Sequence, residues 1–327
     1  MKRIFSVFIL LSIGVSSYAQ DIYDRTLKLM GSRFDITVVA DDQAQAEEYI
    51  DLAVAEISRI EKLISSWDPA SQTSEINQNA GIKPVAVDKE LYQLIERAIR
   101  ISELSDGAFD ISYASIDRIW KFDGSVAEAP DTEVIARSVE NIGYENILLD
   151  PVASSVFLKK EGMKIGFGAI GKGYAADKAK ALLINQGVDA GIINASGDMN
   201  TWGTKPDGSP WRVAITNPFD KTKPYASLPI QHGAVVTSGN YEKFIMIDDQ
   251  RYAHIIDPRT GWPTQGILSV TIFAPKAELA DALATAVFVM GKSAGLDRIN
   301  QLPRIECIIV DKNGDLHTSN QIKIATP

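Results

Sequence analysis

Segments with two different hydrophobic periods alternate along this chain of 327 residues, and this alternation limits the folds that it can adopt. Phe34, Ile36 and Val38 alternate with polar neighbours, which predicts a half-buried strand. Across residues 43–65 apolar side chains recur every three or four positions, which predicts an amphipathic helix. We therefore predict an α+β fold in which mixed, largely antiparallel sheets pack against helices.

The same reasoning predicts further elements along the chain. Helices are predicted at residues 89–105, 171–186, 278–290 and 293–302. Strands are predicted at residues 147–149, 156–159, 163–167, 191–195, 211–215, 234–237, 243–247, 268–274 and 305–310. Residues 122–140 are rich in Gly, Pro and acidic side chains, so we predict an exposed connection there.

The first 19 residues have the pattern of a secretory signal peptide. Lys2 and Arg3 precede an apolar run over residues 4–15, and Ser17 and Ala19 are the small residues expected before a cleavage site. The run is shorter than the roughly 20 residues that a membrane-spanning helix needs, and it contains no cysteine for a lipid anchor. We therefore predict export, cleavage after Ala19, and a soluble periplasmic protein formed by residues 20–327.

Charge and the counts of metal-binding side chains exclude several functions. The chain has 42 acidic and 33 basic residues, a net charge of −9, and loss of Lys2 and Arg3 would change it to −11. A nucleic-acid binder needs a broad cationic face, so no nucleic-acid partner is expected. The single cysteine, Cys307, excludes an intrachain disulfide and a Cys-rich metal site, and three histidines disfavour a multi-histidine centre. A bound metal should therefore have oxygen ligands.

Two segments rich in small residues follow predicted strands. Residues 166–174 (GFGAIGKGY) lead into a helix, where free N–H groups and Lys172 could bind an anion. Their spacing matches neither a P-loop nor the dinucleotide-binding fingerprint, so a tight turn with a solvated lysine explains the segment as well. Residues 194–199 (NASGDM) suit either a ligand crevice at a strand end or an ordinary turn.

Two other segments carry groups with chemical potential. His254 precedes a turn sequence, Asp257-Pro258-Arg259-Thr260-Gly261, and can act as a base near neutral pH, although a lone histidine is more often structural. Asp281 and Thr285 are four residues apart, so a helix places both on one face. Their oxygens suit Mg²⁺, but a helix cap at Asp281 and a hydroxyl–carbonyl bond at Thr285 would also account for them.

Taken together and in this order, these segments resemble the ApbE family, the FAD:protein FMN transferases. The resemblance covers nearly the whole mature chain, from residue 30 to the helix with Asp281 and Thr285. Its motifs are MG at residues 30–31, SSWD at 65–68, SEIN at 74–77, GAFD at 107–110, GAIGKGY at 168–174, SGD at 196–198, TSG at 237–239 and HIIDP at 254–258. It implies an ApbE-like α+β fold, in one unit or in two lobes around a flavin site.

The resemblance also implies roles for individual positions. The FAD site would include Met30, Trp67, Ala108, Phe109, Asp110, Gly166, Lys172 and Ile255. Mg²⁺ would be held by Asp281, Ala284, Thr285 and the backbone carbonyl of Ala169. Trp67 stands where the family often has tyrosine, and either ring can stack on a flavin or adenine.

Two positions depart from the family pattern. The family commonly has an aspartate where Gly166 stands. The absence of that carboxylate would remove one polar contact to FAD. Many members continue after GAFD with proline and a glycine-rich stretch, whereas residues 111–115 are ISYAS here. The loop at this position should therefore have its own shape.

The reaction implied by the resemblance is Mg²⁺-dependent protein flavinylation. A Thr or Ser hydroxyl of a target protein, such as a subunit of a membrane redox complex, attacks the FMN phosphorus of FAD, and AMP leaves. We expect His254 to be the general base, with Asp257 orienting it or replacing it.

Three alternatives to FMN transfer remain. Hydrolysis of FAD to FMN and AMP requires only that water replace the protein hydroxyl. A periplasmic flavin-binding protein without catalysis would not need Asp281, Thr285 and His254. A lipoprotein-like structural component is disfavoured because the anchor cysteine is missing.

Overall fold

The computed structural model describes residues 20–125, 128–216, 224–240 and 243–322. The predicted signal peptide, residues 1–19, lies outside the described residues. All strand pairs in the described part are antiparallel, and helices cover the largest sheet, which confirms the predicted α+β class. None of the helices within the described residues is long and apolar enough to cross a bilayer.

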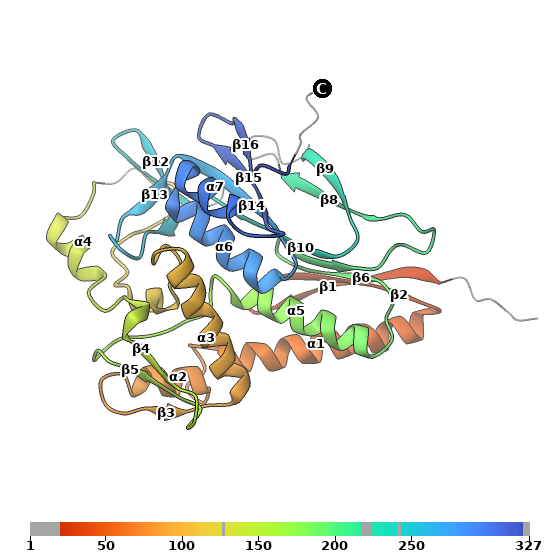
Figure 1. Cartoon of the computed structure of the whole chain (residues 1–327), viewed down its shortest axis with the longest axis horizontal. Helices are drawn as coiled ribbons and strands as arrows, with labels where there is room; N and C mark the ends of the chain where they lie inside the picture. Colours follow the sequence, from red (N-terminus) through yellow and green to blue (C-terminus); the bar gives the residue numbers. More distant parts are fainter. Residues whose placement is uncertain (1–19, 126–127, 217–223, 241–242, 323–327) are drawn as a thin grey trace, which may run out of the picture.

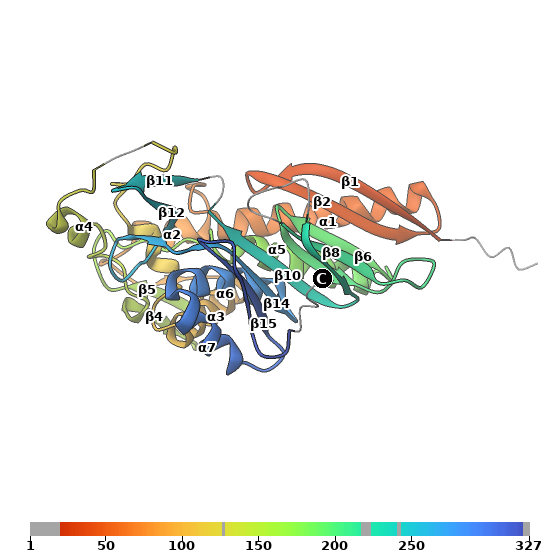
Figure 2. The same ribbon diagram turned by 90° about the horizontal axis from the view of Figure 1, so that it is seen from above.

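The largest sheet has eight strands in the order β1-β2-β6-β7-β10-β14-β15-β16 (Figure 1). A view from above shows β1 and β2 at one end of this sheet and β14 and β15 towards the other (Figure 2). The strands have the following bounds: β1 (Asp21–Leu29), β2 (Ser32–Ala40), β6 (Gly191–Ala195), β7 (Asp198–Trp202), β10 (Gly233–Gly239), β14 (Ile267–Ala274), β15 (Glu306–Asp311) and β16 (Leu316–Thr318). Ile36 of β2 lies opposite Ile193 of β6, so pairing joins segments that are far apart in the chain.

Three helices cover one face of this sheet: α1 (Gln43–Ile64), α5 (Gly171–Asn185) and α6 (Ala277–Met290) (Figure 1). The amphipathic pattern predicted for α1 is confirmed, because its apolar positions are buried in the main core. Asp42 begins α1 by accepting a hydrogen bond from the backbone N–H of Gln45 at 2.9 Å. α5 packs between α1 and α6, so its N-terminus lies beside α6.

Smaller elements surround this layer. The hairpin of β8 (Trp211–Thr216) and β9 (Pro224–Ile230) covers the other face, where Trp211 packs against Val39 and Ala190. One small sheet has the order β3-β5-β4, from β3 (Val85–Ala86), β4 (Ile147–Asp150) and β5 (Ser155–Leu158). Another joins β11 (Phe244–Ile247), β12 (Gln250–Ile256) and β13 (Pro263–Gln265). The remaining helices are α2 (Gln72–Gln78), α3 (Lys89–Leu104), α4 (Thr132–Ser138), α7 (Lys292–Asn300) and the 3-10 turns η1 (Ile111–Ser115) and η2 (Tyr144–Asn146).

Two predictions of local structure are wrong. Residues 163–167 form no strand, because their backbone groups bond outside any ladder: Ile165 donates to the side chain of Asn77 at 2.8 Å and Gly166 to the carbonyl of Ile111 at 2.9 Å. Residues 122–140 are not only a connection, since they contain α4. The helix buries Ile135 in a small core together with Trp120. Because Ile135 is the one buried apolar residue among the seven of this helix, the sequence shows too little hydrophobic periodicity to predict it.

Candidate active site

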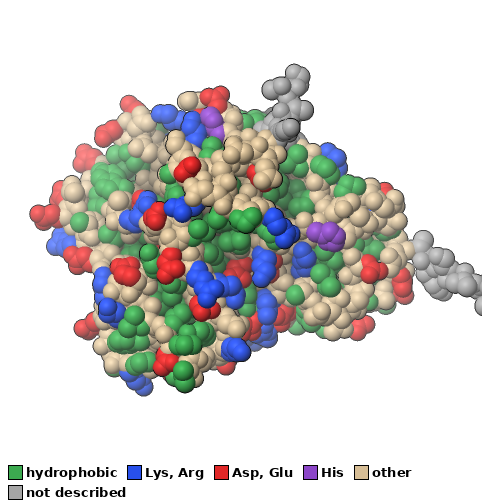
Figure 3. All heavy atoms as spheres, in the orientation of Figure 1, with side chains coloured by type: hydrophobic (Ala, Val, Ile, Leu, Met, Phe, Trp, Pro, Cys, Tyr) green, Lys and Arg blue, Asp and Glu red, His purple; other side chains and the backbone are tan. Residues whose placement is uncertain are grey.

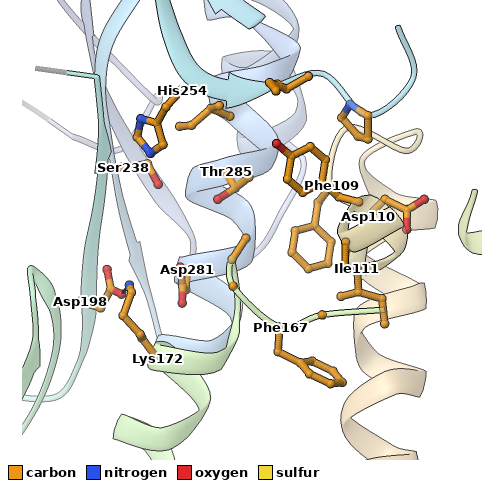
Figure 4. A pocket seen from close by; sticks show the side chains of 18 of the residues that line it. Phe109, Asp110, Ile111, Phe167, Lys172, Asp198, Ser238, His254, Asp281 and Thr285 are labelled. Atoms are coloured by element: carbon orange, nitrogen blue, oxygen red, sulfur yellow. Dashed lines mark hydrogen bonds and ion pairs between the residues drawn. The ribbon is translucent and has the colours of Figure 1, made fainter. Parts of the chain in front are cut away.

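A cavity of about 750 Å³ lies where the start of α5, the middle of α6, the end of β12 and residues 108–114 meet (Figure 4). Cavities of roughly 300–1,000 Å³ are typical of small-molecule and cofactor sites. Side chains from residues 66 to 285 line it, so the complete fold is needed to form it. One side is strongly polar, with Lys172, Asp198 and Asp281, and His254 and Ser238 lie above these residues on the same side in Figure 4.

Glycines at the start of α5 let two helices approach closely. A side chain at Gly173 would overlap the carbonyl oxygen of Ala277 in α6, so only glycine fits this crossing. The N–H of Gly173 donates to Asp281 Oδ2 at 3.2 Å. The predicted turn into a helix is therefore confirmed, and it directs the first turn of α5 at α6.

Lys172 forms an ion pair with Asp198 of β7 and faces Asp281 of α6. Burial opposes the charge on Lys172, but the carboxylates of Asp281 and Asp198 outweigh it and hold its pKa above the usual value. Burial is also the main reason that the pKa of Asp198 is raised, and the neighbouring Asp281 adds to it. Two carboxylates and one ammonium leave an uncompensated negative charge, which favours a bound cation on this side.

Helix α6 carries oxygen donors into the cavity. Asp281 and Thr285 project from successive turns of the helix, and Ala169 lines the cavity from the turn before α5 (Figure 4). Ala284 is fully buried in the same helix and does not line the cavity. The predicted helical placement of Asp281 and Thr285 on one face is confirmed.

The position of α6 is fixed from α5 by a half-buried carboxylate. Lys276 precedes the helix and forms no side-chain cap. Asp177 takes this role, because its carboxylate accepts hydrogen bonds from the backbone N–H groups of Ala277 at 3.0 Å and Glu278 at 2.9 Å. It also accepts a hydrogen bond from Asn200 of β7 at 2.5 Å, so one side chain links α5, α6 and the sheet.

The apolar wall of the cavity comes from residues 108–114. Ala108 and Phe109 are buried side chains that line it. Asp110 lies next to them, but its carboxylate accepts hydrogen bonds from the N–H and hydroxyl of Ser112 and from the N–H of Tyr144, each at 2.7 Å. Burial raises the pKa of Asp110, although these hydrogen bonds act against the shift. Asp110 therefore caps η1 and shapes the wall.

The two departures from the family pattern contact each other in the structure. Gly166 donates its N–H to the carbonyl of Ile111, and a β-carbon at Gly166 would lie only 3.0 Å from that of Ala114. Residues 111–115 form the 3-10 turn η1. The side chain of Ala114 thus approaches the space that a side chain at residue 166 would need.

Trp67 stands at the open rim of the cavity. The residue is 80% exposed, so its ring is accessible from the solvent. The guanidinium of Arg118 lies over the ring, 5.5 Å from its centroid. One face of the indole is therefore covered by a cation.

His254 faces the cavity from an irregular part of β12. The register between β12 and β13 shifts between Tyr252 and Ile256, and such a bulge redirects the side chains within it. The buried Nδ1 of His254 has no hydrogen-bond partner among the described residues. Burial is the main reason that its pKa is lowered from the usual 6.5, so the imidazole is neutral at neutral pH.

Asp257 does not reach His254. Its carboxylate accepts two hydrogen bonds from the guanidinium of Arg259, each at 2.8 Å, and one from the backbone N–H of the same residue at 2.9 Å. Asp257 does not line the cavity, although Pro258 does. The side chain holds the turn after β12 in shape.

Most of the predicted site residues lie together. Those that line the cavity are Trp67, Ala108, Phe109, Asp110, Gly166, Ala169, Lys172, His254, Ile255, Asp281 and Thr285. Met30, Asp257 and Ala284 do not line it. Met30 lies in the turn between β1 and β2, and a β-carbon at Gly171 would be 3.7 Å from its Cε, so it packs behind the start of α5.

Other lining residues had no predicted role. Asp198, Thr237 and Ser238 belong to the short motifs SGD and TSG, so the sequence marked their positions without giving their function. Tyr113 and Lys243 carry no motif signal that could have identified them. Lys243 enters the cavity only because β11 pairs with β12.

Known proteins share this fold and most of this length. Residues 30–309 match the ApbE family. The chain is 33% identical to an FAD:protein FMN transferase of Klebsiella pneumoniae, over 91% of this chain and 92% of that protein. It is also 33% identical to an FAD:protein FMN transferase of Treponema pallidum, over 76% and 73%. The crystal structure of the ApbE protein of Thermotoga maritima aligns with a TM-score of 0.82 at 32% identity, over 91% of this chain and 97% of that one. The chain belongs to the ApbE family.

Proposed function

We propose that this protein transfers the FMN part of FAD to the hydroxyl of a Thr or Ser residue in a target protein and releases AMP. The observation that carries the proposal is one cavity that combines an apolar wall, the side-chain oxygens of Asp281 and Thr285, and a neutral histidine. The relatives that bear the name FAD:protein FMN transferase support it.

The two sides of the cavity suit the two chemical parts of FAD. Ala108, Phe109 and Ile255 provide apolar surface for a ring system, and the exposed indole of Trp67 can stack on a flavin or adenine. The diphosphate carries the negative charge and fits the polar side of the cavity, between Lys172 with the start of α5 and His254. Binding in this orientation spans the cavity.

The donors around Asp281 fit Mg²⁺. Within the described residues no three His, Cys, Asp or Glu side chains gather to hold a metal, so backbone and hydroxyl oxygens have to complete a site here. Such oxygens suit Mg²⁺ rather than Zn²⁺. In this proposal Asp281, Thr285 and the carbonyls of Ala169 and Ala284 hold the ion, which supplies positive charge for the diphosphate when bound.

His254 acts as the general base of the proposed reaction. The acceptor oxygen forms a bond to the FMN phosphorus, its proton moves to the imidazole, and the bond from that phosphorus to the bridging oxygen breaks. AMP leaves with the bridging oxygen and its electron pair. Because burial keeps His254 neutral, it can accept the proton at neutral pH without help from Asp257.

We further propose that the acceptor lies outside the cytoplasm. The pattern of residues 1–19 supports export, cleavage after Ala19 and a periplasmic location for residues 20–327. A subunit of a membrane redox complex would be an accessible acceptor there. Expression of the full chain in a Gram-negative host should give a periplasmic protein that begins at Gln20 by N-terminal sequencing. A cytoplasmic product that still carries Met1 would contradict this location.

Mass spectrometry of an acceptor tests the function directly. The mature protein is incubated with FAD, Mg²⁺ and a candidate acceptor protein, with an acceptor whose Thr or Ser has been replaced by Ala as the control. A mass gain equal to FMN on the first acceptor alone supports transfer. Free FMN and AMP without labelling of any acceptor would support FAD hydrolysis instead, and intact FAD would contradict both.

A further inference from the structure

Lys243 lies directly across the strand pair from His254. Phe244 of β11 pairs with Ala253 of β12, and the backbone N–H of His254 donates to the carbonyl of Lys243 at 3.2 Å. Residues opposite each other in an antiparallel pair project from the same face. Both residues line the cavity, so their side chains belong to the same part of its surface.

The charge of Lys243 reaches the histidine. Burial is the main cause that lowers the pKa of His254, the hydrogen bond with the Lys243 backbone acts against it, and the ammonium of Lys243 adds a smaller lowering effect. The two groups are therefore close enough to interact electrostatically across the cavity surface. Lys243 itself is exposed, so its charge meets whatever enters this part of the cavity.

The two lysines of the cavity differ in how their charge is balanced. Lys172 is paired with Asp198 and faces Asp281. No ion pair joins Lys243 to a carboxylate elsewhere in the described residues. An anion near His254 would thus find an ammonium that is not already neutralised by those residues.

We propose that Lys243 binds the FMN phosphate of FAD, which is the group that is transferred. This assignment rests on the proposed function, because the attacked phosphorus has to lie within reach of an oxygen whose proton goes to His254. That position is beside Lys243. The ammonium contacts the phosphate oxygens, and it stabilises the charge that they carry as the new P–O bond forms and the bond to AMP breaks.

Binding of two flavins that differ only by a phosphate tests the contact without any turnover. We compare FMN and riboflavin by flavin fluorescence, with Mg²⁺ present, on the wild-type protein and on Lys243→Met. The variant should bind FMN roughly tenfold more weakly, which is the loss of one charge-assisted contact of about 1.4 kcal/mol. Riboflavin affinity should stay within about twofold of the wild-type value, because riboflavin has no phosphate.

Two variants make the comparison specific. Lys243→Arg keeps the charge and should recover most of the FMN affinity. Lys83→Met removes an exposed lysine that does not line the cavity, and it should leave both affinities unchanged. An unchanged FMN affinity in Lys243→Met, or an equal loss for FMN and riboflavin, would overturn the proposal.

Release of AMP from FAD links the contact to chemistry. At saturating FAD, Lys243→Met should release AMP about 10- to 100-fold more slowly than the wild-type protein, in the range seen when one donor to a developing charge is removed. The acceptor protein is present in this measurement, because transfer needs its hydroxyl as the nucleophile, and AMP release then reports cleavage of FAD by transfer or by hydrolysis. A wild-type protein that releases no AMP would refute the proposed function, and the flavin-binding comparison would still decide the role of Lys243.

Discussion

The imidazole of His254 lacks a supporting hydrogen bond from the described residues. Its buried Nδ1 has no partner among the described residues, and the nearby Asp257 is committed to Arg259. A histidine that serves the fold usually has its ring nitrogens satisfied, because an unpaired buried polar atom costs stability. The lack of a structural partner favours a role in binding or proton transfer.

Replacing His254 by Asn should remove the base and keep the volume. We expect transfer to fall by roughly 10²- to 10⁴-fold, the range for general bases, while FAD affinity changes little. In the wild-type protein the rate should fall as the pH drops through the lowered pKa of His254, because the protonated ring cannot accept a proton. Near-normal transfer by His254→Asn, or a wild-type rate that rises in acid, would exclude this role.

Replacing Asp281 by Ala should abolish Mg²⁺-dependent turnover. Its carboxylate is the charged member of the oxygen set on α6, so the remaining hydroxyl and carbonyls would bind the ion weakly. Titration of Mg²⁺ by calorimetry measures binding without activity, and Asp297→Ala on α7, away from the cavity, is the matched control. An unchanged Mg²⁺ affinity in Asp281→Ala would refute the assignment.

Single residues of this site could be predicted only where a motif marked them. Lys172, His254 and Asp281 were found because glycines, a turn or a helical spacing surround them. Asp110 was also found, but its carboxylate is taken up by Ser112 and Tyr144, and no sequence pattern reports such hydrogen bonds. Lys243 was missed because its place depends on strand register.

At the scale of elements, the crossing of α5 and α6 positions the side chains of the proposed cation site. Gly173 allows the helices to touch, and Asp177 holds the first turn of α6. The backbone N–H of Gly173 donates to Asp281. The carboxylate of Asp177 accepts from backbone N–H groups at the start of the helix that carries Asp281. A shift of α6 along its axis would move Asp281 and Thr285 together.

Replacing Asp177 by Asn should therefore loosen α6 and weaken the cation site. The side-chain amide can no longer accept from all its donors, and the loss of a cap typically costs about 0.5–2 kcal/mol. Urea unfolding measures that cost, and Mg²⁺ titration measures the site. Asp131→Asn is the control, since Asp131 precedes α4 without forming a side-chain cap. Equal stability and equal Mg²⁺ affinity in both variants would contradict the role of Asp177.

Whole elements were predictable in proportion to the strength of their pattern. α1 was predicted to within one residue, because its apolar positions repeat over 22 residues. α4 has only seven residues and was missed. β12 was also missed, because its side chains are mostly half-buried and its bulge breaks the alternation. Residues 163–167 look like a strand, but tertiary hydrogen bonds replace a ladder.

At the scale of the molecule, charge opposes the proposed substrate. The chain carries −9, and removal of residues 1–19 would make it −11, while FAD has an anionic diphosphate. On the face shown in Figure 3, Lys and Arg side chains are interspersed with Asp and Glu side chains. Attraction for FAD therefore has to arise within the cavity.

Salt should speed the association of FAD with the mature protein. Raising the ionic strength from about 0.01 to 0.1 M shortens the Debye length from about 30 to 10 Å, which screens the repulsion between like charges. We expect an increase of about twofold in the association rate constant, measured by stopped-flow fluorescence. Riboflavin is uncharged and should show no change. A rate for FAD that falls with salt would mean that the cations of the cavity dominate the approach.

The spread of the lining residues along the chain has a consequence for biosynthesis. The cavity uses Ser66 near its beginning and Thr285 near its end, and β2 pairs with β6 across most of the intervening sequence. Such long-range pairings form late, because the loop between them has to close first. A nascent chain that stops before α6 lacks Asp281 and Thr285, so its cavity is incomplete. Flavin can therefore be captured only after the ribosome has released nearly the whole polypeptide.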